Sequence, residues 1–363
     1  MSALVQGAAA RMLTKGNEAI CLGAIAAGCR HYYGYPITPQ NDIPEYMAAH
    51  LPALGGTFLQ AESEVATINF ILGTSASGKR VMTSSSGPGI SLMQEGLSYM
   101  AGSELPAVIV NISRSGPGLG GIAPSQGDYF QSVKGGGHGG YRLIVLAPHS
   151  VQEMYSLTML AFDLADRHRT PVVILGDAIV GQMKEPFRPI PYTPAVPPEK
   201  PWALTGCAGR ERQNLKSLHL KDNAIEVHNW KLHEKYERIR KEEVRSESFL
   251  LEGAKIGIVA FGTAARVSKT AIQWARKEGI PVGMLRPVTL FPFPEREIRE
   301  LAPQADVLLV IEMNTGQMVA DVRQCTPLHD RIEFFGKPCA MPTPEEILVR
   351  IRSLSGRRGG ADR

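Results

Sequence analysis

Short apolar runs alternate with amphipathic stretches along residues 14–185. The apolar runs are rich in Val, Ile and Tyr, as buried strands are, and the stretches between them repeat apolar residues at helical spacing. Strands that alternate with helices in this way predict an α/β fold with a buried parallel sheet. The expected strands cover residues 31–36, 56–61, 80–86, 106–113, 142–148 and 170–177, and the expected helices cover residues 16–29, 40–51, 63–77, 89–101 and 150–166.

A second alternation of the same kind follows residue 253 and predicts a smaller α/β unit. Its expected strands cover residues 255–263 with a turn, 281–287, 305–313 and 331–336, and its expected helices cover residues 264–279, 293–304, 316–324 and 343–354.

The sequence between the two units has a different character. Residues 185–202 are proline-rich and should be extended, and residues 211–248 are heavily charged, which predicts a long exposed helix. Such a linker is suited to wrapping around another surface. The predicted division is a first domain over residues 1–190, a Pro-rich and charged linker over residues 191–252, a second domain over residues 253–355 and a disordered tail over residues 356–363.

Composition excludes several classes of function. The chain has 39 Lys and Arg residues against 35 Asp and Glu, a net charge of +4 at pH 7, and this small excess argues against nucleic acid as a partner. No apolar run approaches the roughly 18 residues of a membrane helix, so no membrane association is expected. The five cysteines include no CxxC pair, which argues against a disulfide framework, a zinc site or a self-contained iron–sulfur cluster. We therefore expect a cytoplasmic protein that holds no metal.

Several motifs match known sites only in part. GPGLGG at 116–121 fits the GxGxxG pattern, but no apolar helix follows it, so a dinucleotide site is disfavoured. GTSASGKR at 73–80 ends a predicted helix and lacks the hydroxyl residue of a P-loop. His228 and His233 are five apart, the wrong offset for one helical face. His138 lies in a glycine-rich loop, and a loop role is favoured over catalysis.

Two acids, Glu62 and Glu64, stand at the start of an apolar helix in the stretch QAESEVATINF. Ser63 is a plausible N-cap, which would place Glu64 in the first helical turn. The simplest interpretation is a carboxylate that complements the helix dipole. The alternative is a carboxylate that pairs with a bound ligand, because charged side chains are rarely left in apolar surroundings without a partner.

The first domain resembles the α subunit of 2-oxoacid:ferredoxin oxidoreductases in four stretches, KGNEAICLGAIAAGCRHYYGYPITPQNDIPEYM, FLQAESEVATINF, MTSSSGPGISLMQEGLSYM and NISRSGPGLGGIAPSQGDYFQ. These enzymes use thiamine diphosphate and are related to pyruvate:ferredoxin oxidoreductase. The resemblance continues through VAFGTAAR, LRPVTLFPFP and VIEMNTGQM. QAESEVA and GPGLGGIAPSQ are most similar to the branched-chain (2-oxoisovalerate) type, whereas the 2-oxoglutarate type more often carries EDE where this chain has Glu62-Ser63-Glu64.

The resemblance implies a pyrimidine-binding thiamine diphosphate fold with a parallel sheet, followed by a transketolase C-terminal-like α/β domain. It implies that Glu64, rather than Glu62, is the acid that hydrogen-bonds the cofactor's pyrimidine ring, and that Thr38 and Arg114 contact the 2-oxoacid. For Thr38 the alternative is that it caps a helix opened by Pro39. The resemblance places the following residues, besides Glu64, around the cofactor: Pro36, Ile37, Ser86, Gly87, Pro88 and Gly89.

Two parts of a complete enzyme are missing from the sequence. Neither Gly176-Asp177-Ala178 nor Gly127-Asp128-Tyr129 is followed by the Asn that completes the usual diphosphate motif, and the cysteines cannot hold a cluster. By the resemblance, a β subunit should bring the Mg²⁺ site for the diphosphate and a [4Fe-4S] cluster. A γ subunit and in many cases a ferredoxin-like δ subunit should complete the complex.

The implied reaction converts a 2-oxoacid, CoA and oxidised ferredoxin into acyl-CoA, CO₂ and reduced ferredoxin. A branched-chain 2-oxoacid such as 2-oxoisovalerate is the expected substrate, with 2-oxoglutarate or another 2-oxoacid as the alternative. Two further hypotheses remain open at this point. The chain could be a non-catalytic scaffold of such a complex, or a self-sufficient transketolase-like transferase.

Overall fold

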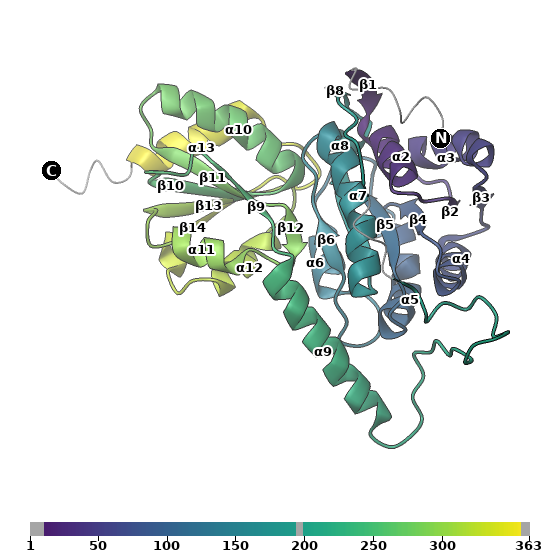
Figure 1. Ribbon diagram of the computed structural model, residues 1–363. Helices are drawn as coiled ribbons and strands as arrows, with labels where there is room; N and C mark the ends of the chain where they lie inside the picture. Colours follow the sequence, from purple (N-terminus) through teal and green to yellow (C-terminus); the bar gives the residue numbers. More distant parts are fainter. Residues whose placement is uncertain (1–10, 194–198, 357–363) are drawn as a thin grey trace.

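The computed structural model describes residues 11–193 and 199–356, which form two α/β units side by side (Figure 1). Nearly all of the tail expected to be disordered, residues 356–363, lies outside the described residues. The larger unit contains a seven-stranded sheet and the smaller unit a five-stranded sheet. The predicted α/β fold is confirmed.

The sheet of the larger unit is parallel except for one edge strand. Its three central strands are buried at every position, so both faces of the sheet are covered. Its strands stand in the order β12 (Thr289–Phe291), β6 (Ile144–Leu146), β7 (Pro171–Asp177), β5 (Ala107–Ser113), β4 (Val81–Ser85), β2 (His31–Gly34) and β3 (Thr57–Gln60). The helices of this unit are α2 (Gly16–Ala26), α3 (Asp42–His50), α4 (Glu64–Ala76), α5 (Pro88–Gly102), α6 (Tyr129–Lys134), α7 (Val151–His168) and α8 (Ala178–Gln182).

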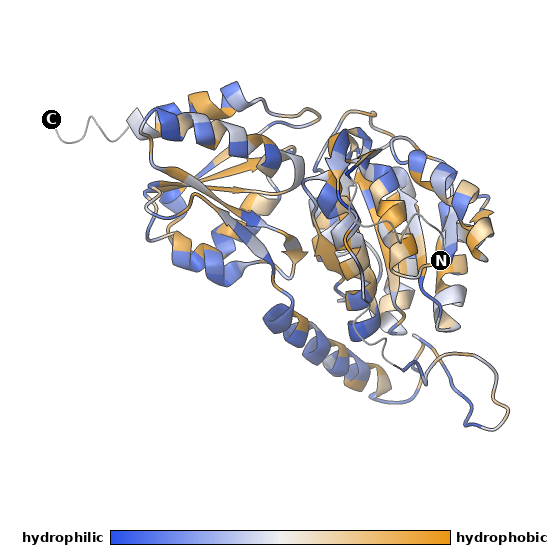
Figure 2. Cartoon of the chain, turned by 45° about the horizontal axis from the view of Figure 1, so that its top comes forward, coloured by the Kyte–Doolittle hydropathy of each residue, from blue (hydrophilic) through white to orange (hydrophobic). Residues whose placement is uncertain are grey.

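The sheet of the smaller unit has four parallel strands and one antiparallel edge strand. Its strands stand in the order β14 (Ile332–Gly336), β13 (Val307–Glu312), β10 (Ile256–Ala260), β11 (Val282–Pro287) and β9 (Ser246–Phe249). The helices of this unit are α10 (Gly262–Lys277), α11 (Glu295–Leu301), α12 (Met318–Gln324) and α13 (Pro344–Gly356). Figure 2 shows that the strands inside both units are mostly hydrophobic.

Two edge strands pair with strands that belong to a different predicted segment of the chain. β9 lies within the predicted linker but pairs with β11 in the smaller sheet. β12 follows β11 in sequence but pairs antiparallel with β6 at the edge of the larger sheet. Both strands are short, and hydrophobic periodicity cannot assign such short strands to a sheet. The segment boundaries given above remain predictions.

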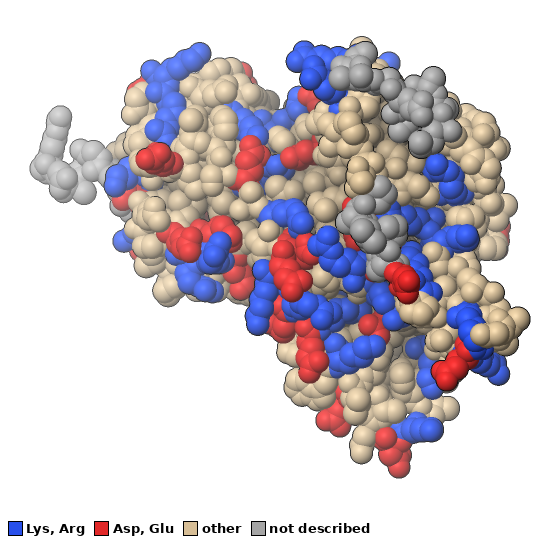
Figure 3. Space-filling model, viewed as in Figure 1, with Lys and Arg blue, Asp and Glu red and all other residues tan. Residues whose placement is uncertain are grey.

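The charged segment between the units contains one long helix, α9 (Ala224–Glu242), which is mostly hydrophilic in Figure 2. The prediction that this helix is exposed was wrong for one face. Leu232, Lys235, Tyr236 and Ile239 are buried, and their spacing is that of a helix stripe packed on a core. In Figure 3, cations and acids are interspersed over the face around α9.

A separate two-stranded ribbon pairs β1 (Met12–Lys15) with β8 (Lys184–Phe187).

A network of hydrogen bonds holds the loop before α6 against the smaller unit. The Gln126 side chain donates to the Phe261 carbonyl at 2.9 Å and accepts from the Met313 backbone N–H at 3.0 Å. The Asn314 side chain donates to the Gln126 carbonyl at 2.9 Å, and the Gln317 side chain donates to the Gly127 carbonyl at 2.7 Å. The two units therefore meet through satisfied, directional polar contacts, which fix their relative placement.

Asp177 makes a second connection between the units. Its carboxylate caps α8 by accepting from the backbone N–H groups of Ile179 and Val180, and it also accepts from the Thr263 hydroxyl at 2.9 Å. Burial raises the pKa of Asp177, and these hydrogen bonds oppose that rise. The Gly176-Asp177-Ala178 motif therefore has a structural role, because its acid caps α8 and contacts Thr263.

A third connection is the buried Arg286 guanidinium on β11, which donates to both carboxylate oxygens of Glu153 on α7 at 2.6 and 3.0 Å. His149 also lies 2.7 Å from Glu153. Burial raises the pKa of Glu153, but the hydrogen bonds from His149 and Arg286 and their positive charges lower it to about 2. The ionised carboxylate therefore stabilises the contact between the units.

This interaction predicts a dependence of stability on pH. Because the folded pKa of Glu153 is about 2 and the ordinary value is 4.5, its stabilisation should be complete above pH 4.5 and lost as the pH falls toward 2. The variant Glu153→Gln should lose stability at neutral pH and show a shallower decline in acid, measured by urea unfolding across that range. The exposed Glu252→Gln variant should follow the wild type. An unchanged acid slope in Glu153→Gln would contradict this assignment.

Candidate active site

The predicted site residues gather at one edge of the larger sheet. Residues 35–41 follow β2, residues 86–88 follow β4, Arg114 follows β5, and Glu64 begins α4 close after β3. The carboxyl ends of neighbouring parallel strands meet at this edge, where open α/β sheets bind their ligands. The fold therefore brings together residues as far apart in sequence as Pro36 and Arg114.

Glu64 is buried at the start of α4, with only 5% of the residue exposed. Ser63 is the N-cap, as predicted, and its hydroxyl accepts a hydrogen bond from the Ala66 backbone N–H at 3.2 Å. The Ser85 hydroxyl approaches a Glu64 carboxylate oxygen at 3.4 Å. Among the described residues no cation pairs with Glu64, so the positive end of the helix dipole is the main favourable interaction for its charge.

Two glycines shape the turn opposite Glu64. A Cβ atom on Gly89 would lie 2.3 Å from the Glu64 carboxylate oxygen and 2.2 Å from the Ser85 hydroxyl, so the helix backbone is in direct contact with the acid. Gly87 has a φ of +48°, a conformation that favours glycine, and a Cβ there would lie 3.2 Å from Arg114 Nε. Glycine at these positions therefore lets the start of α5 approach the acid and the Arg114 side chain closely.

Arg114 connects two of the loops. Its Nη1 donates to the Thr38 carbonyl oxygen at 2.9 Å, and its Nη2 donates to the Leu119 carbonyl oxygen at 3.2 Å. The Arg114 Nε and the Ser86 hydroxyl are buried and have no hydrogen-bond partner within the described part of the chain. Buried polar groups are normally satisfied, so these two atoms mark a place where a ligand would complete the hydrogen bonding.

The loop after β2 does not support the alternative role of Thr38 as a helix cap. Helix α3 begins at Asp42 with Asn41 as its N-cap residue, so Thr38 does not cap it. Pro36 and Thr38 are exposed and Ile37 is half-buried. The three residues therefore lie at the outer rim of the site, where they are accessible to a ligand or to another chain.

A cavity of about 440 Å³ extends from this edge to the smaller unit. Gly87, Arg114 and Asp128 line it on one side, and Asn314 and Gln317 line it on the other. The contact between the two units therefore forms one wall of the site as well as stabilising the fold.

Asp128 lines this cavity near Arg114. Burial raises the pKa of Asp128, and a hydrogen bond of 3.0 Å from the Asn111 side chain together with the charge of Arg114 opposes the rise. From the sequence, Asp128 belonged only to an incomplete diphosphate motif, and Ser85 was not predicted as a site residue. The hydroxyl-rich run at the end of β4 was the available signal for Ser85.

The partial motifs have structural explanations. Residues 116–121 form a tight loop closed by a bond from the Gly121 N–H to the Ser115 carbonyl, and no helix begins there. Residues 73–80 span the end of α4. His228 bonds the Gly102 carbonyl at 2.7 Å. His138 is exposed, and its role stays a prediction.

Comparison with known proteins identifies the fold and its family. The model of the thiamine diphosphate-binding domain of pyruvate flavodoxin/ferredoxin oxidoreductases matches residues 22–245, and the model of pyruvate:ferredoxin oxidoreductase core domain II matches residues 254–343. The chain belongs to the 2-oxoacid:ferredoxin oxidoreductase family. The resemblance seen in the sequence is therefore confirmed, and this oxidoreductase chain is an enzyme subunit.

Relatives with assigned names cover nearly the whole oxidoreductase chain. It is 49% identical to ketoisovalerate oxidoreductase subunit VorB of Methanothermobacter thermautotrophicus, across 96% of this chain and 99% of that protein. It is 40% identical to 2-oxoglutarate synthase subunit KorA of Archaeoglobus fulgidus, across 93% of this chain and 97% of that protein. Both relatives are named as subunits of larger enzymes.

Solved structures agree with the fold. A 2-oxoglutarate:ferredoxin oxidoreductase from Magnetococcus marinus matches with a TM-score of 0.84 and 30% identity, over 94% of this chain and 65% of that one. A split-gene transketolase matches with a TM-score of 0.57 and 13% identity, over 93% of this chain and 97% of that one, which shows a shared fold alone. Within the described residues, no helix combines the length and the apolar character needed to cross a membrane.

The residues of the oxidoreductase chain fit one half of thiamine diphosphate. Buried Glu64, the close approach of Gly89 and the unpaired Ser86 hydroxyl suit a polar heterocycle that needs an acid and hydrogen-bond donors. The acid of the Gly176-Asp177-Ala178 motif is already occupied by α8 and Thr263. The described residues therefore suit the pyrimidine end of the cofactor and offer no comparable set for the diphosphate end.

The close packing at Gly89 can be tested by substitution. Gly89→Ala should lower the free energy of unfolding by about 1–3 kcal/mol, because the new methyl group overlaps Glu64 and Ser85. Gly73→Ala is a matched control in α4, where a Cβ meets no atom within 4 Å, and it should be neutral or stabilising. Urea unfolding of both variants measures the difference. Equal stabilities would show that the helix does not press on the acid.

Proposed function

We propose that this oxidoreductase chain is an α subunit that acts on a branched-chain 2-oxoacid such as 2-oxoisovalerate, with CoA and ferredoxin as the other reactants. The names of the relatives support this choice, since the ketoisovalerate oxidoreductase subunit is more similar to the chain than the 2-oxoglutarate synthase subunit. The cavity beside Arg114 has room for a small 2-oxoacid. The alternative substrate is 2-oxoglutarate or another 2-oxoacid.

The buried Glu64 carries the proposal. Its carboxyl group lies near the carboxyl ends of the strands, and none of the cations in residues 11–193 and 199–356 pairs with it, so it is suited to share a proton with a ring nitrogen of the cofactor's pyrimidine. Bound thiamine diphosphate supplies the electron sink for cleaving the carbon–carbon bond of the 2-oxoacid. In this proposal Gly87, Pro88 and Gly89 bring the backbone of α5 close to the ring, and the Ser86 hydroxyl, Pro36 and Ile37 complete its surroundings.

Arg114 and Thr38 are proposed to hold the substrate. Two nitrogens of the Arg114 guanidinium are fixed by backbone carbonyls, which orients the group, while Nε stays free to donate. A guanidinium keeps its positive charge and suits a carboxylate. The exposed Thr38 hydroxyl lies on the loop that Arg114 holds, so both groups act from one rigid unit.

Partner subunits are proposed to supply the remaining chemistry. A β subunit would bind the diphosphate through Mg²⁺ and carry a [4Fe-4S] cluster, and γ and δ subunits would complete the complex. The cysteines of this chain support that arrangement, because Cys21, Cys29 and Cys325 are buried, and burial raises their pKa values. Metal-binding thiols are deprotonated, so these sites disfavour cluster ligation. The cytoplasmic location stays a prediction.

Exchange of the central acid tests the proposal. Glu64→Gln should lower viologen reduction by the assembled complex about 100-fold or more, because the amide cannot hold the proton that the pyrimidine needs. The neighbouring, exposed Glu62→Gln should stay within about twofold of wild type. Assays with pyruvate, 2-oxoglutarate, 2-oxoisovalerate and aryl pyruvates would establish the substrate.

Two outcomes would favour the other hypotheses. Full activity of the Glu64→Gln complex would point to a non-catalytic scaffold. Turnover by the isolated chain with thiamine diphosphate and Mg²⁺ would point to a self-sufficient transferase.

The proposed contact with the β subunit also has a candidate surface. Large apolar side chains are exposed along α4 and α5, the two helices whose first turns contact the acid: Val65, Phe70, Leu92 and Tyr99. Exposed apolar groups on neighbouring helices are typical of an interface. A partner seated there would close the open side of the site over Glu64.

This surface predicts an effect on assembly. Leu92→Asp should prevent the tagged chain from copurifying with its partner while leaving its own thermal unfolding close to wild type, because Leu92 is 51% exposed. Val349→Asp, at an exposed site on α13 in the smaller unit, is the control and should assemble normally. Normal copurification of the Leu92→Asp chain would exclude this face as the contact.

A further inference from the structure

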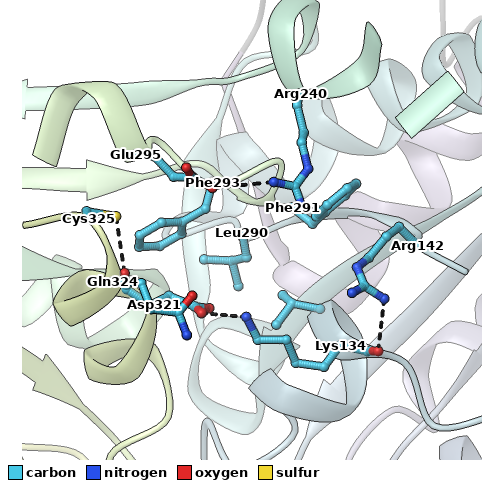
Figure 4. A pocket seen from close by; sticks show the side chains of 11 residues that line it. Lys134, Arg142, Arg240, Leu290, Phe291, Phe293, Glu295, Asp321, Gln324 and Cys325 are labelled. Carbon is cyan, nitrogen blue, oxygen red and sulfur yellow. Dashed lines mark hydrogen bonds and ion pairs between the residues drawn. The ribbon is translucent and has the colours of Figure 1, made fainter. Parts of the chain in front are cut away.

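A second cavity lies between the two units, away from the candidate active site (Figure 4). Its volume is about 300 Å³. Lys134 at the end of α6 and Arg142 before β6 line it, and Arg142 stands at the amino end of the parallel strands. Glu64 and Arg114 stand at the carboxyl ends of such strands, so the cavity lies toward the other end of the strands from the site described above, and the short helix α6 lines both cavities through Gln131 and Lys134.

Three cations from separate elements approach this cavity: Lys134, Arg142 and Arg240. Lys134 is neutralised by the buried Asp321, which also accepts from the Tyr129 hydroxyl at 2.6 Å. Asp321 therefore already has two partners. The remaining positive charge at the cavity belongs to the two arginines.

The two arginines are weakly compensated. Arg142 donates to the backbone carbonyls of Lys134 at 3.3 Å and Tyr141 at 2.8 Å, and it forms no ion pair within the described residues. Arg240 has only long contacts with acids, 3.4 Å to Glu237 and 3.7 Å to Glu295, both of them exposed or half-exposed. Exposed ion pairs of this kind contribute little, so both guanidinium groups are available to an anion.

Aromatic rings form the floor between these cations. Phe291 and Leu290 of β12 are buried, and the Arg240 guanidinium lies over the Phe291 ring at 5.5 Å. Figure 4 shows the Phe293 ring between Glu295 and Asp321, on the side of the cavity near Cys325. Arginine planes and aromatic rings are the surfaces on which nucleobases stack.

We propose that this cavity binds a nucleoside phosphate of mononucleotide size, with the phosphate between Arg142 and Arg240 and the base against the half-buried Phe293 ring. Bidentate guanidinium groups match phosphate oxygens, and the ring supplies a flat apolar surface for the base. The volume is at the lower end of the range for small-molecule sites, which suits one nucleotide and excludes a dinucleotide. An extended acidic peptide would need a longer basic groove.

The position of the cavity gives the ligand a physical effect. Val133 and Arg142 belong to the larger unit, while Glu295 and Cys325 belong to the smaller one, so a ligand held there contacts both. A ligand that binds only the folded, docked arrangement raises the unfolding temperature. Nucleotide binding would therefore stabilise the relative placement of the two units, which also forms one wall of the active-site cavity.

Binding measurements on the full chain and on the assembled complex test this inference. AMP should bind saturably in isothermal titration calorimetry and raise the unfolding temperature, whereas adenosine and inorganic phosphate should each bind at least tenfold more weakly. Arg142→Gln and Arg240→Gln should each weaken AMP binding at least tenfold. Arg296→Gln, an exposed arginine of α11 outside the cavity, should change it by less than twofold. Thermal unfolding without ligand and viologen reduction verify that the variants fold and assemble.

Each of the following results would overturn the inference. Inorganic phosphate that binds as tightly as AMP would remove the role of the ring. AMP binding that survives in Arg142→Gln would place the nucleotide elsewhere, including at the site where the complex takes CoA. Absence of saturable AMP binding in both the chain and the complex would leave the cavity without this ligand. These outcomes do not depend on the activity of Glu64 variants, so the proposed function stands or falls separately.

Discussion

Glu64 is a carboxylate that the fold buries, and no cation of the described residues pairs with it. It is held at the start of α4, where it faces the helix dipole, the backbone of Gly89 packs against it, and the Ser85 hydroxyl donates to it at 3.4 Å. Burying such a group costs free energy unless a partner hydrogen-bonds it. The long hydrogen bond from Ser85 meets this requirement only in part, and the neighbouring Arg114 Nε and Ser86 hydroxyl have no partner within the described residues. A polar cofactor ring would complete the hydrogen bonding of Glu64 and Ser86, and a substrate carboxylate would complete that of the Arg114 Nε.

The smaller unit has a direct part in this arrangement. Gln126, Asn314 and Gln317 connect the loop before α6 to the segment after β13, and the same loop contributes Asp128 to the cavity beside Arg114. Contacts that stabilise the fold therefore also set the shape of the site. The cavity lined by Arg142 and Arg240 also lies between the two units. A ligand bound there and a substrate bound at Arg114 would therefore both contact the interface between the units.

Much of this could be predicted from the sequence, and the failures have physical causes. The alternation of apolar runs with amphipathic stretches located the sheets, and Ser63 was correctly assigned as the cap that precedes Glu64. The sheet pairings of β9 and β12 were not predicted, because such short strands carry no periodic pattern that identifies their partner strands. Thr38 was assigned an alternative role as a helix cap, but α3 begins further along. The contacts of Gln126 and Asp177 depend on groups far apart in sequence, and no local pattern reveals them.

The most direct measurement is an experimental structure of the assembled complex with thiamine diphosphate bound. A Glu64 carboxylate oxygen should lie at hydrogen-bond distance, about 2.6–3.2 Å, from a nitrogen of the pyrimidine ring, and a different subunit should hold the diphosphate and its metal. A pyrimidine ring bound away from Glu64, or a single chain that holds both ends of the cofactor, would contradict this arrangement.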